Sequence, residues 1–335
     1  MSECLVTYGD VIFEVDVQVE AIPKAGQDAI VTDLRFTPGG SAANCAAVAA
    51  RLGAKARSLG LVGQDAFGAM LLQDLEHHGV DVSGLRSVAG PTAMAVIIID
   101  RTGERSFLSF RGVGVSVPYG PLPASLIQAG DCLHISGYAF QTPHSRDTAL
   151  HLIAVAQEVG AMISVDPSFH FAREVMAKYS HLLDAVDFFL PNQEEAFQIV
   201  GTQEPIQAAE ELLSLGIGAV LLKLGMDGCL IATQLGITHI PAYSAPRVVD
   251  TTGAGDAFAG GFLAATLKGC RLEESARVGQ AAAALVVAKV GGHAGAPTVS
   301  ELRDFAYEQQ DAGLLATLTR LESYSYQIRS RKDTE

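Results

Sequence analysis

Short apolar segments alternate with amphipathic segments over most of the chain. Residues Phe67–His78 carry apolar side chains at helical spacing and stop at Gly79, a common helix end. Residues Ala56–Val62 and Ala161–Val165 instead have the apolar character of buried strands. Because strands that alternate with helices are typical of parallel βαβ units, the pattern predicts an α/β fold with a doubly wound, mostly parallel sheet covered on both faces. Further helices are expected at Ser41–Leu52, Arg146–Val159, Glu194–Val200 and Gln207–Leu215, and further strands at Cys132–Ser136, Phe188–Leu190, Ala219–Leu224 and Val248–Val249.

Two segments interrupt this alternation, at residues 11–37 and 92–117. The first alternates Val15, Val17 and Val19 with acidic and amide side chains, which is the period of a half-solvated strand. The second holds two apolar runs separated by a turn. Both segments predict antiparallel strands outside the parallel sheet, folded over its edge as a small β-sheet lid.

Composition narrows the class of protein. Hydrophobic residues make up 49% of the sequence and charged residues 18%, which predicts a large core and excludes wholesale disorder. The formal charge of −14 argues against a nucleic-acid-binding surface. We expect one domain over residues 1–318 and a polar tail at 319–335, either a frayed helix or disordered. No signal sequence or bilayer-spanning run is recognisable, which predicts a cytoplasmic protein without membrane contact.

The segment Asp250–Phe258 has the strongest chemical character. Its glycines, Gly253 and Gly255, let an anion approach the backbone of a strand-to-helix loop, beside the positive end of the helix dipole. Asp256 lies within this loop, where a carboxylate next to an anion site suggests phosphoryl transfer to a hydroxyl. The alternative for a single Asp at this place is a helix cap.

A second glycine pair, Gly39–Gly40, precedes Ser41 and Asn44. It is consistent with a turn in which Ser41 caps a helix. It is equally consistent with a backbone that admits a polyol, with Asn44 offering donors and acceptors to hydroxyls. Neither a Walker A sequence nor a dinucleotide fingerprint follows a strand, which excludes two common nucleotide sites.

These motifs together resemble the ribokinase-like (PfkB) family of carbohydrate kinases. The resemblance rests on Gly39–Gly40 with Asn44, on Asp250–Asp256, on Pro191-Asn192-Gln193-Glu194-Glu195 and on Lys223-Leu224-Gly225-Met226-Asp227-Gly228. It extends from about Val6 to Leu315. The family fold, a doubly wound α/β domain with a β-lid, agrees with the pattern above.

The resemblance implies roles for individual residues. Asp256 is the general base, and Gly253, Ala254 and Gly255 form the anion hole. Asn192 and Glu195 organise the phosphates and Mg²⁺, the latter through water, although the same pair also fits a helix capping box. The nucleotide side is implied for Lys223, Gly225, Gly228 and His293. Lys223 stands where a small hydroxyl residue is common, and a strand-end lysine reaching solvent is the alternative.

The acceptor side is implied less directly. The family places an acid about five positions after the glycine of the first strand, which indicates Glu14, with Asp10 and Asp16 as rivals. Arg105 and Arg111 of the lid are further candidates. The sequence Asp166-Pro167-Ser168-Phe169-His170 departs from the Asp-Pro-Asn-x-Arg of fructokinases and ketodeoxygluconate kinases, which puts those two substrates in doubt.

The sequence therefore predicts an ATP-dependent, Mg²⁺-requiring kinase that phosphorylates a hydroxymethyl group of a sugar-like substrate. K⁺ binding near Asp250 and residues 288–295, and a homodimer formed through the lid, are further expectations. The alternatives are a nucleoside kinase of the same fold and a non-catalytic binding protein. An aromatic wall for a nucleobase is expected from Phe13, Phe107, Phe110 and Tyr138.

Overall fold

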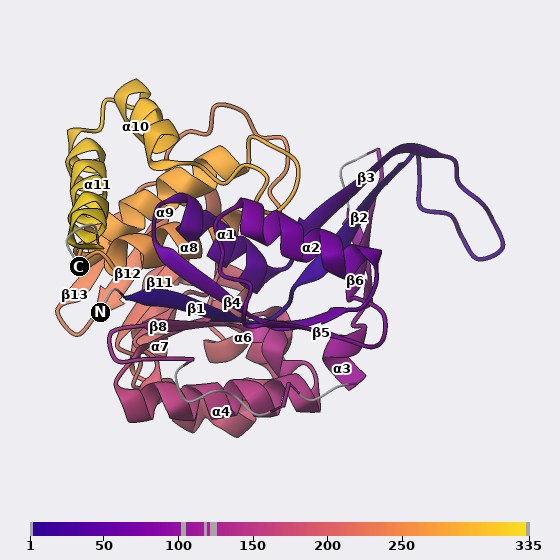
Figure 1. The fold of residues 1–335 in the computed structure, drawn as a ribbon, viewed down its shortest axis with the longest axis horizontal. Helices are drawn as coiled ribbons and strands as arrows, with labels where there is room; N and C mark the ends of the chain where they lie inside the picture. The colour runs from indigo at the N-terminus through magenta and orange to yellow at the C-terminus, as the bar shows by residue number, and fades with distance from the viewer. Residues whose placement is uncertain (1–2, 102–104, 117–118, 121–125, 333–335) are drawn as a thin grey trace.

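The computed structural model describes residues 3–101, 105–116, 119–120 and 126–332. Nine strands form the main sheet in the order β13-β12-β11-β10-β9-β8-β1-β4-β5 (Figure 1). All neighbouring pairs from β11 to β5 are parallel, whereas β12 and β13 continue the sheet as antiparallel strands. The strands are β1 Cys4–Tyr8, β4 Lys55–Gly63, β5 Leu85–Val88, β8 Cys132–Ser136, β9 Met162–Asp166, β10 Phe188–Phe189, β11 Ala219–Lys223, β12 Cys229–Thr233 and β13 Gly236–Ile240.

Helices cover both faces of this sheet, which confirms the doubly wound α/β prediction. One hydrophobic cluster joins the sheet to α1, α2, α8, α9, α10 and α11, and a second joins its other face to α4, α6 and α7 (Figure 1). The helices are α1 Ser41–Arg51, α2 Ala66–His77, α3 Val113–Ser116, α4 Pro143–Val159, α5 Met176–Tyr179, α6 Gln193–Val200, α7 Pro205–Leu213, α8 Ala254–Thr266, α9 Leu272–Val286, α10 Val299–Glu308 and α11 Ala312–Lys332. None of the described helices is long and apolar enough to cross a bilayer.

The close contact of α1 with α8 depends on a small residue. A Cβ at Gly260 would lie 2.6 Å from the carbonyl oxygen of Cys45. Glycine therefore lets the two helix backbones approach each other. This approach sets the relative position of the two helix N-termini that carry the site described below.

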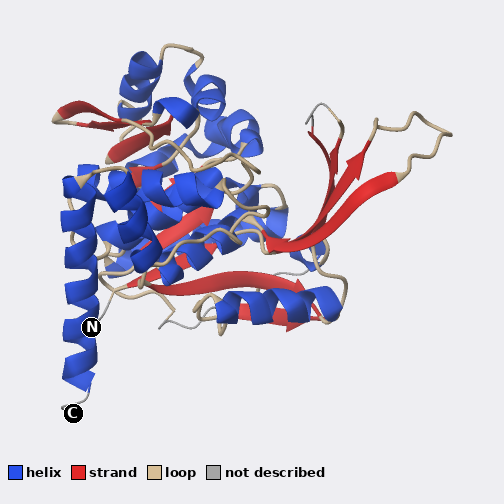
Figure 2. Cartoon of the chain, turned by 90° about the horizontal axis from the view of Figure 1, so that it is seen from above, coloured by secondary structure: helices blue, strands red, loops and turns tan. Residues whose placement is uncertain are grey.

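Four strands form the separate lid sheet, in the order β3-β2-β6-β7. They are β2 Ile12–Val19, β3 Val31–Gly39, β6 Met94–Ile99 and β7 Arg105–Phe110, and Figure 2 shows them extending away from the α/β body. The two outer pairs are antiparallel as expected, but the central pair, β2 with β6, is parallel. The prediction of purely antiparallel pairing was therefore wrong, because the two hairpin-like segments meet through strands that run in the same direction.

One further expectation differs from the structure. Val248 and Val249 form no strand; both are exposed, and Val249 donates a backbone hydrogen bond to the Val287 carbonyl after α9. The segment expected as a tail from residue 319 continues α11 as far as Lys332, a helix being one of the two forms expected for it, and the domain boundary stays a prediction. Leu318 and Leu321 of that helix are buried against the core, so helical spacing of a few leucines outweighs the polar composition of the segment.

Candidate active site

A cavity opens between the lid and the edge of the sheet at which the parallel strands end. Asp10 follows β1, Asp166 ends β9 and Lys223 ends β11. Glu14 faces the same cavity from the lid, and Asp256 faces it from the first turn of α8. The fold thus brings together residues that lie up to 246 positions apart in the sequence (256 − 10).

Asp256 is held by two side chains of α1. Ser41 Oγ donates to Asp256 Oδ1 at 2.8 Å, and Asn44 Nδ2 donates to Oδ2 at 2.8 Å. Burial raises the pKa of Asp256 to about 6, while the Asn44 and Ser41 hydrogen bonds oppose that rise. The carboxylate is therefore ionised at neutral pH and close to the range in which a general base is effective.

The loop before α8 places the helix N-terminus beside a cation. Gly253 has φ 75°, and a Cβ there would overlap the Gly292 backbone, so glycine is required. Gly255 faces Lys223, whose Nζ would lie 3.2 Å from a Cβ at Gly255. The positive end of α8 and the ammonium group together form a place where negative charge is stabilised.

Lys223 is an internal cation rather than a residue reaching solvent. Its Nζ contacts Asp166 Oδ2 at 2.6 Å, and both side chains are largely buried. Burial raises the pKa of Asp166, and Lys223 opposes the rise. The interpretation of Lys223 as a strand end extended into water was therefore wrong.

Asn192 and Glu195 form the helix capping box that the sequence allowed. Asn192 Oδ1 accepts from the Glu195 N–H at 2.8 Å, and Glu195 Oε2 accepts from the Asn192 N–H at 2.9 Å. Both residues nevertheless line the cavity beside Lys223. Burial raises the pKa of Glu195, and the charge of Lys223 opposes the rise. The cap thus holds oxygen atoms at the rim of the site.

Of the three acids considered near the first strand, Asp10 and Glu14 line the cavity, whereas Asp16 lines a different depression with Asp250. Asp10 accepts from the Ser41 N–H and from Ser136 Oγ, each at 3.2 Å. Burial, followed by the charge of Asp16, raises the pKa of Glu14 to about 8.

The glycine pair makes room for the lid acid. A Cβ at Gly39 would lie 2.6 Å from the Glu14 carboxyl carbon. At Gly40, φ is 105°, and a Cβ would overlap the Asp10 carbonyl. Gly40 is also the N-cap of α1 and no side chain caps this helix, which leaves Ser41 available to Asp256.

Several predicted positions lie elsewhere. His293 is buried between Asn44 and Asp74 and does not line the cavity with Lys223, and its assignment to the nucleotide stays a prediction. Gly225 and Gly228 lie in the turn between β11 and β12, and their role stays a prediction. Arg105 begins β7 opposite Ile99, but its side chain lies outside the described residues.

The Asp250 carboxylate connects two loops by accepting a backbone hydrogen bond from each. Its Oδ1 accepts from the Thr252 N–H at 2.9 Å, and its Oδ2 accepts from the Gly291 N–H at 3.1 Å. The carboxylate therefore ties the loop before α8 to the loop after α9. The expectation that Asp250 shapes the loop fits these contacts, and the chemical role of Asp256 stays a prediction.

Two participants were not recognised from the sequence. Ser41 was interpreted as a helix cap, although it donates to Asp256, and Asp166 was noted only as a departure from a motif. A buried strand ending in Asp-Pro was the available signal for Asp166. Ser41 lies 215 residues from its partner, so no local pattern reveals the contact.

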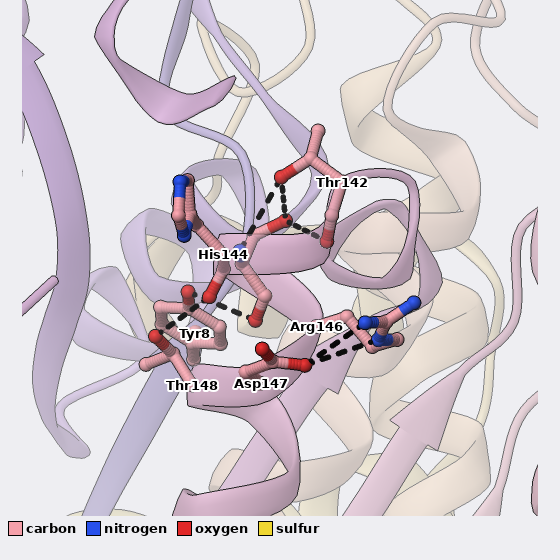
Figure 3. A network of polar contacts seen from close by, with 7 residues as sticks. Tyr8, Thr142, His144, Arg146, Asp147 and Thr148 are labelled. Carbon is pink, nitrogen blue, oxygen red and sulfur yellow. Dashed lines mark hydrogen bonds and ion pairs between the residues drawn. The ribbon is translucent and has the colours of Figure 1, made fainter. Parts of the chain in front are cut away.

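A second cavity adjoins the first and shares Asp10, Ile12 and Tyr138 with it. Figure 3 shows the polar network at the start of α4 that helps to build its wall. Tyr8 OH donates to the Ser145 carbonyl at 3.2 Å, and the hydroxyls of Thr142 and Ser145 lie 2.7 Å apart. Tyr8, Tyr119 and Tyr138 give this cavity an aromatic lining. Of the other expected aromatic residues, Phe107 lines the first cavity and Phe13 is buried against Phe67.

Comparison with known proteins agrees with this architecture. Residues 2–299 match the pfkB family of carbohydrate kinases. An ATP-dependent ribose-1-phosphate kinase of Halopiger xanaduensis is 32% identical over 304 residues, covering 90% of this chain and 98% of the relative. Arabidopsis thaliana ribokinase, solved in complex with ribose and ATP, is 27% identical with a TM-score of 0.82, covering 91% of this chain and 98% of that one. Aminoimidazole riboside kinase of Salmonella enterica is 26% identical with a TM-score of 0.74, covering 90% and 99%.

A ribokinase-like fold with a lid and an acidic cavity at the strand ends defines a sugar or nucleoside kinase. The chain belongs to the pfkB family of carbohydrate kinases, and the resemblance found in its motifs is confirmed.

The ion pair of Lys223 with Asp166 gives a testable expectation. Lys223→Met should lower the free energy of unfolding by about 3–5 kcal/mol, because Asp166 is left buried without its partner. The double variant Lys223→Met/Asp166→Leu should recover most of this loss in urea unfolding. Since a raised folded-state pKa favours protonated Asp166, the single variant should be less destabilised at pH 5 than at pH 8. An equal loss of unfolding free energy in the single and the double variant would contradict the ion pair.

Proposed function

We propose that this protein transfers the γ-phosphoryl group of ATP to a hydroxymethyl group of a sugar or sugar-like acceptor. The observation that carries the proposal is the place of Asp256, a buried carboxylate at the N-terminus of α8. Glu14 of the lid, Asp10 after β1 and Lys223 at the end of β11 line the same cavity as Asp256. We infer that the acceptor lies beside Asp10 and Glu14 and the phosphate donor beside Lys223.

In this proposal the acceptor hydroxyl lies next to Asp256. Its oxygen forms a bond to the γ-phosphorus, the bond between that phosphorus and the leaving ADP oxygen breaks, and the proton passes to the carboxylate. The amides of Gly253 and Gly255, with Lys223, would face the charge on the transferring group, whereas the Ala254 N–H donates to the Thr251 carbonyl at 3.3 Å and would have to turn from it to take part. Ser41 and Asn44 keep the carboxylate pointed at the cavity.

The donor side has the oxygen ligands that Mg²⁺ prefers. Glu195 and Asn192 present a carboxylate and an amide at the cavity rim, which fits a magnesium ion held through water beside the phosphates. Bound Mg²⁺ would offset phosphate charge. The K⁺ site near Asp250 stays a prediction, because both carboxylate oxygens already accept backbone hydrogen bonds.

The acidic lining favours an uncharged, hydroxyl-rich acceptor. Asp10, Glu14 and Asp256 surround the acceptor position, and carboxylates accept hydrogen bonds from neighbouring hydroxyls. A second phosphate placed beside Asp10 and Glu14 would find no cation to pair with there: burial raises the pKa of both acids, and Lys223 is already paired with Asp166. We therefore propose an uncharged sugar rather than a sugar phosphate, although one relative is a ribose-1-phosphate kinase.

The second candidate function is a nucleoside kinase. The aromatic cavity beside Asp10 supports it, because Tyr8, Tyr119 and Tyr138 offer ring faces and edges for a base attached to a ribose. The aminoimidazole riboside kinase among the solved relatives acts on such a compound. The non-catalytic alternative has no structural observation in its favour.

The lid also supports the proposal of a homodimer. Leu34, Phe36, Leu108 and Phe110 of the lid strands are exposed, and a second lid would cover such residues. The cytoplasmic location stays a prediction.

Asp256→Asn tests the proposed function. The variant keeps the shape of the side chain but removes the proton acceptor, so kcat should fall by roughly 10²–10⁴-fold while acceptor binding changes little. Initial rates of ADP formation and calorimetric titration with the acceptor measure the two quantities. Thermal unfolding serves as the control for folding. A variant with nearly normal turnover would rule Asp256 out as the base.

A substrate panel separates the two candidate functions. ADP formation is measured with uncharged sugars, sugar phosphates and nucleosides under equal conditions. We expect the highest kcat/KM for an uncharged sugar, because the cavity beside Asp256 is acidic. A nucleoside that exceeds every sugar would establish the second candidate, and a sugar phosphate in first place would overturn the charge argument.

A further inference from the structure

The hydrogen bond from Asn44 to Asp256 is the inner end of a longer chain of contacts. Asn44 Oδ1 lies 2.6 Å from His293 Nδ1, and His293 Nε2 lies 2.6 Å from Asp74 Oδ2. The chain thus runs from α8 through α1 and the loop after α9 to α2. His293 is only 2% exposed, whereas Asp74 lies closer to solvent.

The chemistry of the partners fixes the hydrogens on His293. An amide oxygen and an ionised carboxylate only accept hydrogen bonds, so both ring nitrogens of His293 donate. Both ring nitrogens thus face acceptor atoms, and Nε2 lies 2.6 Å from the Asp74 carboxylate. Burial raises the pKa of Asp74, but the His293 hydrogen bond and charge bring it below its ordinary value.

This contact selects one orientation of the Asn44 amide. The oxygen and nitrogen of an Asn side chain are nearly equal in shape, so packing alone distinguishes the two orientations poorly. In the reversed orientation the amide oxygen would face the Asp256 carboxylate, and the two would repel each other. The donor on His293 Nδ1 holds the oxygen on its own side and leaves the NH₂ group for Asp256.

The loop that carries His293 lies directly against this amide. A Cβ at Gly292 would lie 2.7 Å from Asn44 Cγ and would overlap the amide nitrogen. Gly292 therefore permits the approach that places the imidazole beside Asn44. His293 has no contact with the cavity and acts only through its neighbour.

We propose that His293, anchored by Asp74, is a positioning residue that keeps the Asn44 amide donating to Asp256. This inference rests on the proposed function of Asp256 as general base. Because the Asn44 hydrogen bond lowers the pKa of Asp256, its loss should raise that pKa and reduce the ionised fraction of the base.

Other ionisable groups surround both ends of the chain, and the test must separate them from His293. The charged or titratable groups near Asp74 and His293 are His77, His78 and Arg51. Those that act on Asp256 are Asp10, Glu14, Asp166, Glu195, Lys223, Cys45 and Tyr138.

Each of two substitutions of His293 retains one of its two hydrogen bonds and removes the other. His293→Asn places an amide near the position of Nδ1, where it still donates to Asn44 but does not reach Asp74. His293→Gln reaches the position of Nε2, where it still donates to Asp74 but loses Asn44. We expect His293→Gln to lower kcat on the order of 10- to 100-fold, with a smaller change in KM, and His293→Asn to retain more of kcat.

The pH profile distinguishes positioning from a general structural effect. In His293→Gln the acid limb of kcat, which reports protonation of Asp256, should move to higher pH, and in His293→Asn it should move less. His78→Gln is the control for packing and for nearby contacts: His78 packs edge-on against His293 with ring centroids 4.9 Å apart and contacts Asp74, but it has no hydrogen bond to Asn44. Because this variant retains both hydrogen bonds of His293, its acid limb should move less than that of His293→Gln.

Three outcomes would overturn the inference. They are an unchanged kcat and acid limb in His293→Gln, an equal loss in both His293 variants with an unmoved limb, or a shift in His78→Gln of the same size. If the His293 variants fail to fold, Asp74→Asn replaces them. It removes the counter-ion with little change of shape, and it should lower kcat several-fold and move the acid limb upward; an unchanged profile would contradict the proposal.

The Asp256→Asn variant shows whether the general-base role of Asp256 fails or only the positioning role of His293. If that variant retains turnover, Asp256 is not the base and the proposed function fails. If Asp256→Asn is inactive while His293→Gln keeps the kcat and pH profile of the unmodified protein, the proposed function stands and only the positioning role fails.

Discussion

The two hydrogen bonds that Ser41 and Asn44 donate to Asp256 connect the N-terminal half of this kinase to its C-terminal half. They join the first turns of α1 and α8, two helices that pack closely because Gly260 has no side chain. The same bonds oppose the effect of burial on the Asp256 carboxyl group. Fold and proposed chemistry therefore depend on one contact between helices.

Charge balance is the second constraint on the cavity. Asp10, Glu14, Asp166, Glu195 and Asp256 all line it, so most of its ionisable groups are acids. Burial raises the pKa of each of them, and Lys223 opposes this for Asp166 and Glu195. The cation stands beside the N-terminus of α8, at the place where a phosphoryl group would add further negative charge. Lys223 is the one cation among the described residues that line this cavity, and it is paired with Asp166.

Much of the fold follows from local sequence patterns. Apolar runs such as 161–165 and helical spacing such as 67–78 predicted the alternating elements, and the loop 250–256 predicted a helix start beside an anion site. Patterns failed where geometry depends on distant partners. The parallel pairing of β2 with β6, for example, is set by how two segments about 80 residues apart in the sequence meet in space.

The candidate site shows the same division. The cap of Asn192 with Glu195 is a local motif and was predicted, whereas Ser41 and His293 contact partners more than 200 residues away. Among the residues visible in the sequence, glycines best indicated where distant parts of the site approach the backbone. Gly39, Gly253 and Gly292 each stand where another part of the site approaches the backbone, but the sequence does not say which part.

The central claim is that a buried Asp256, held ionised by its two donors, accepts the proton of the acceptor hydroxyl. The pH dependence of kcat at saturating ATP and acceptor tests it most directly. The account predicts a fall in kcat as pH decreases through about 6, with one proton taken up, because protonated Asp256 no longer serves as a base. A kcat that stays constant down to pH 5 in a folded enzyme would contradict it.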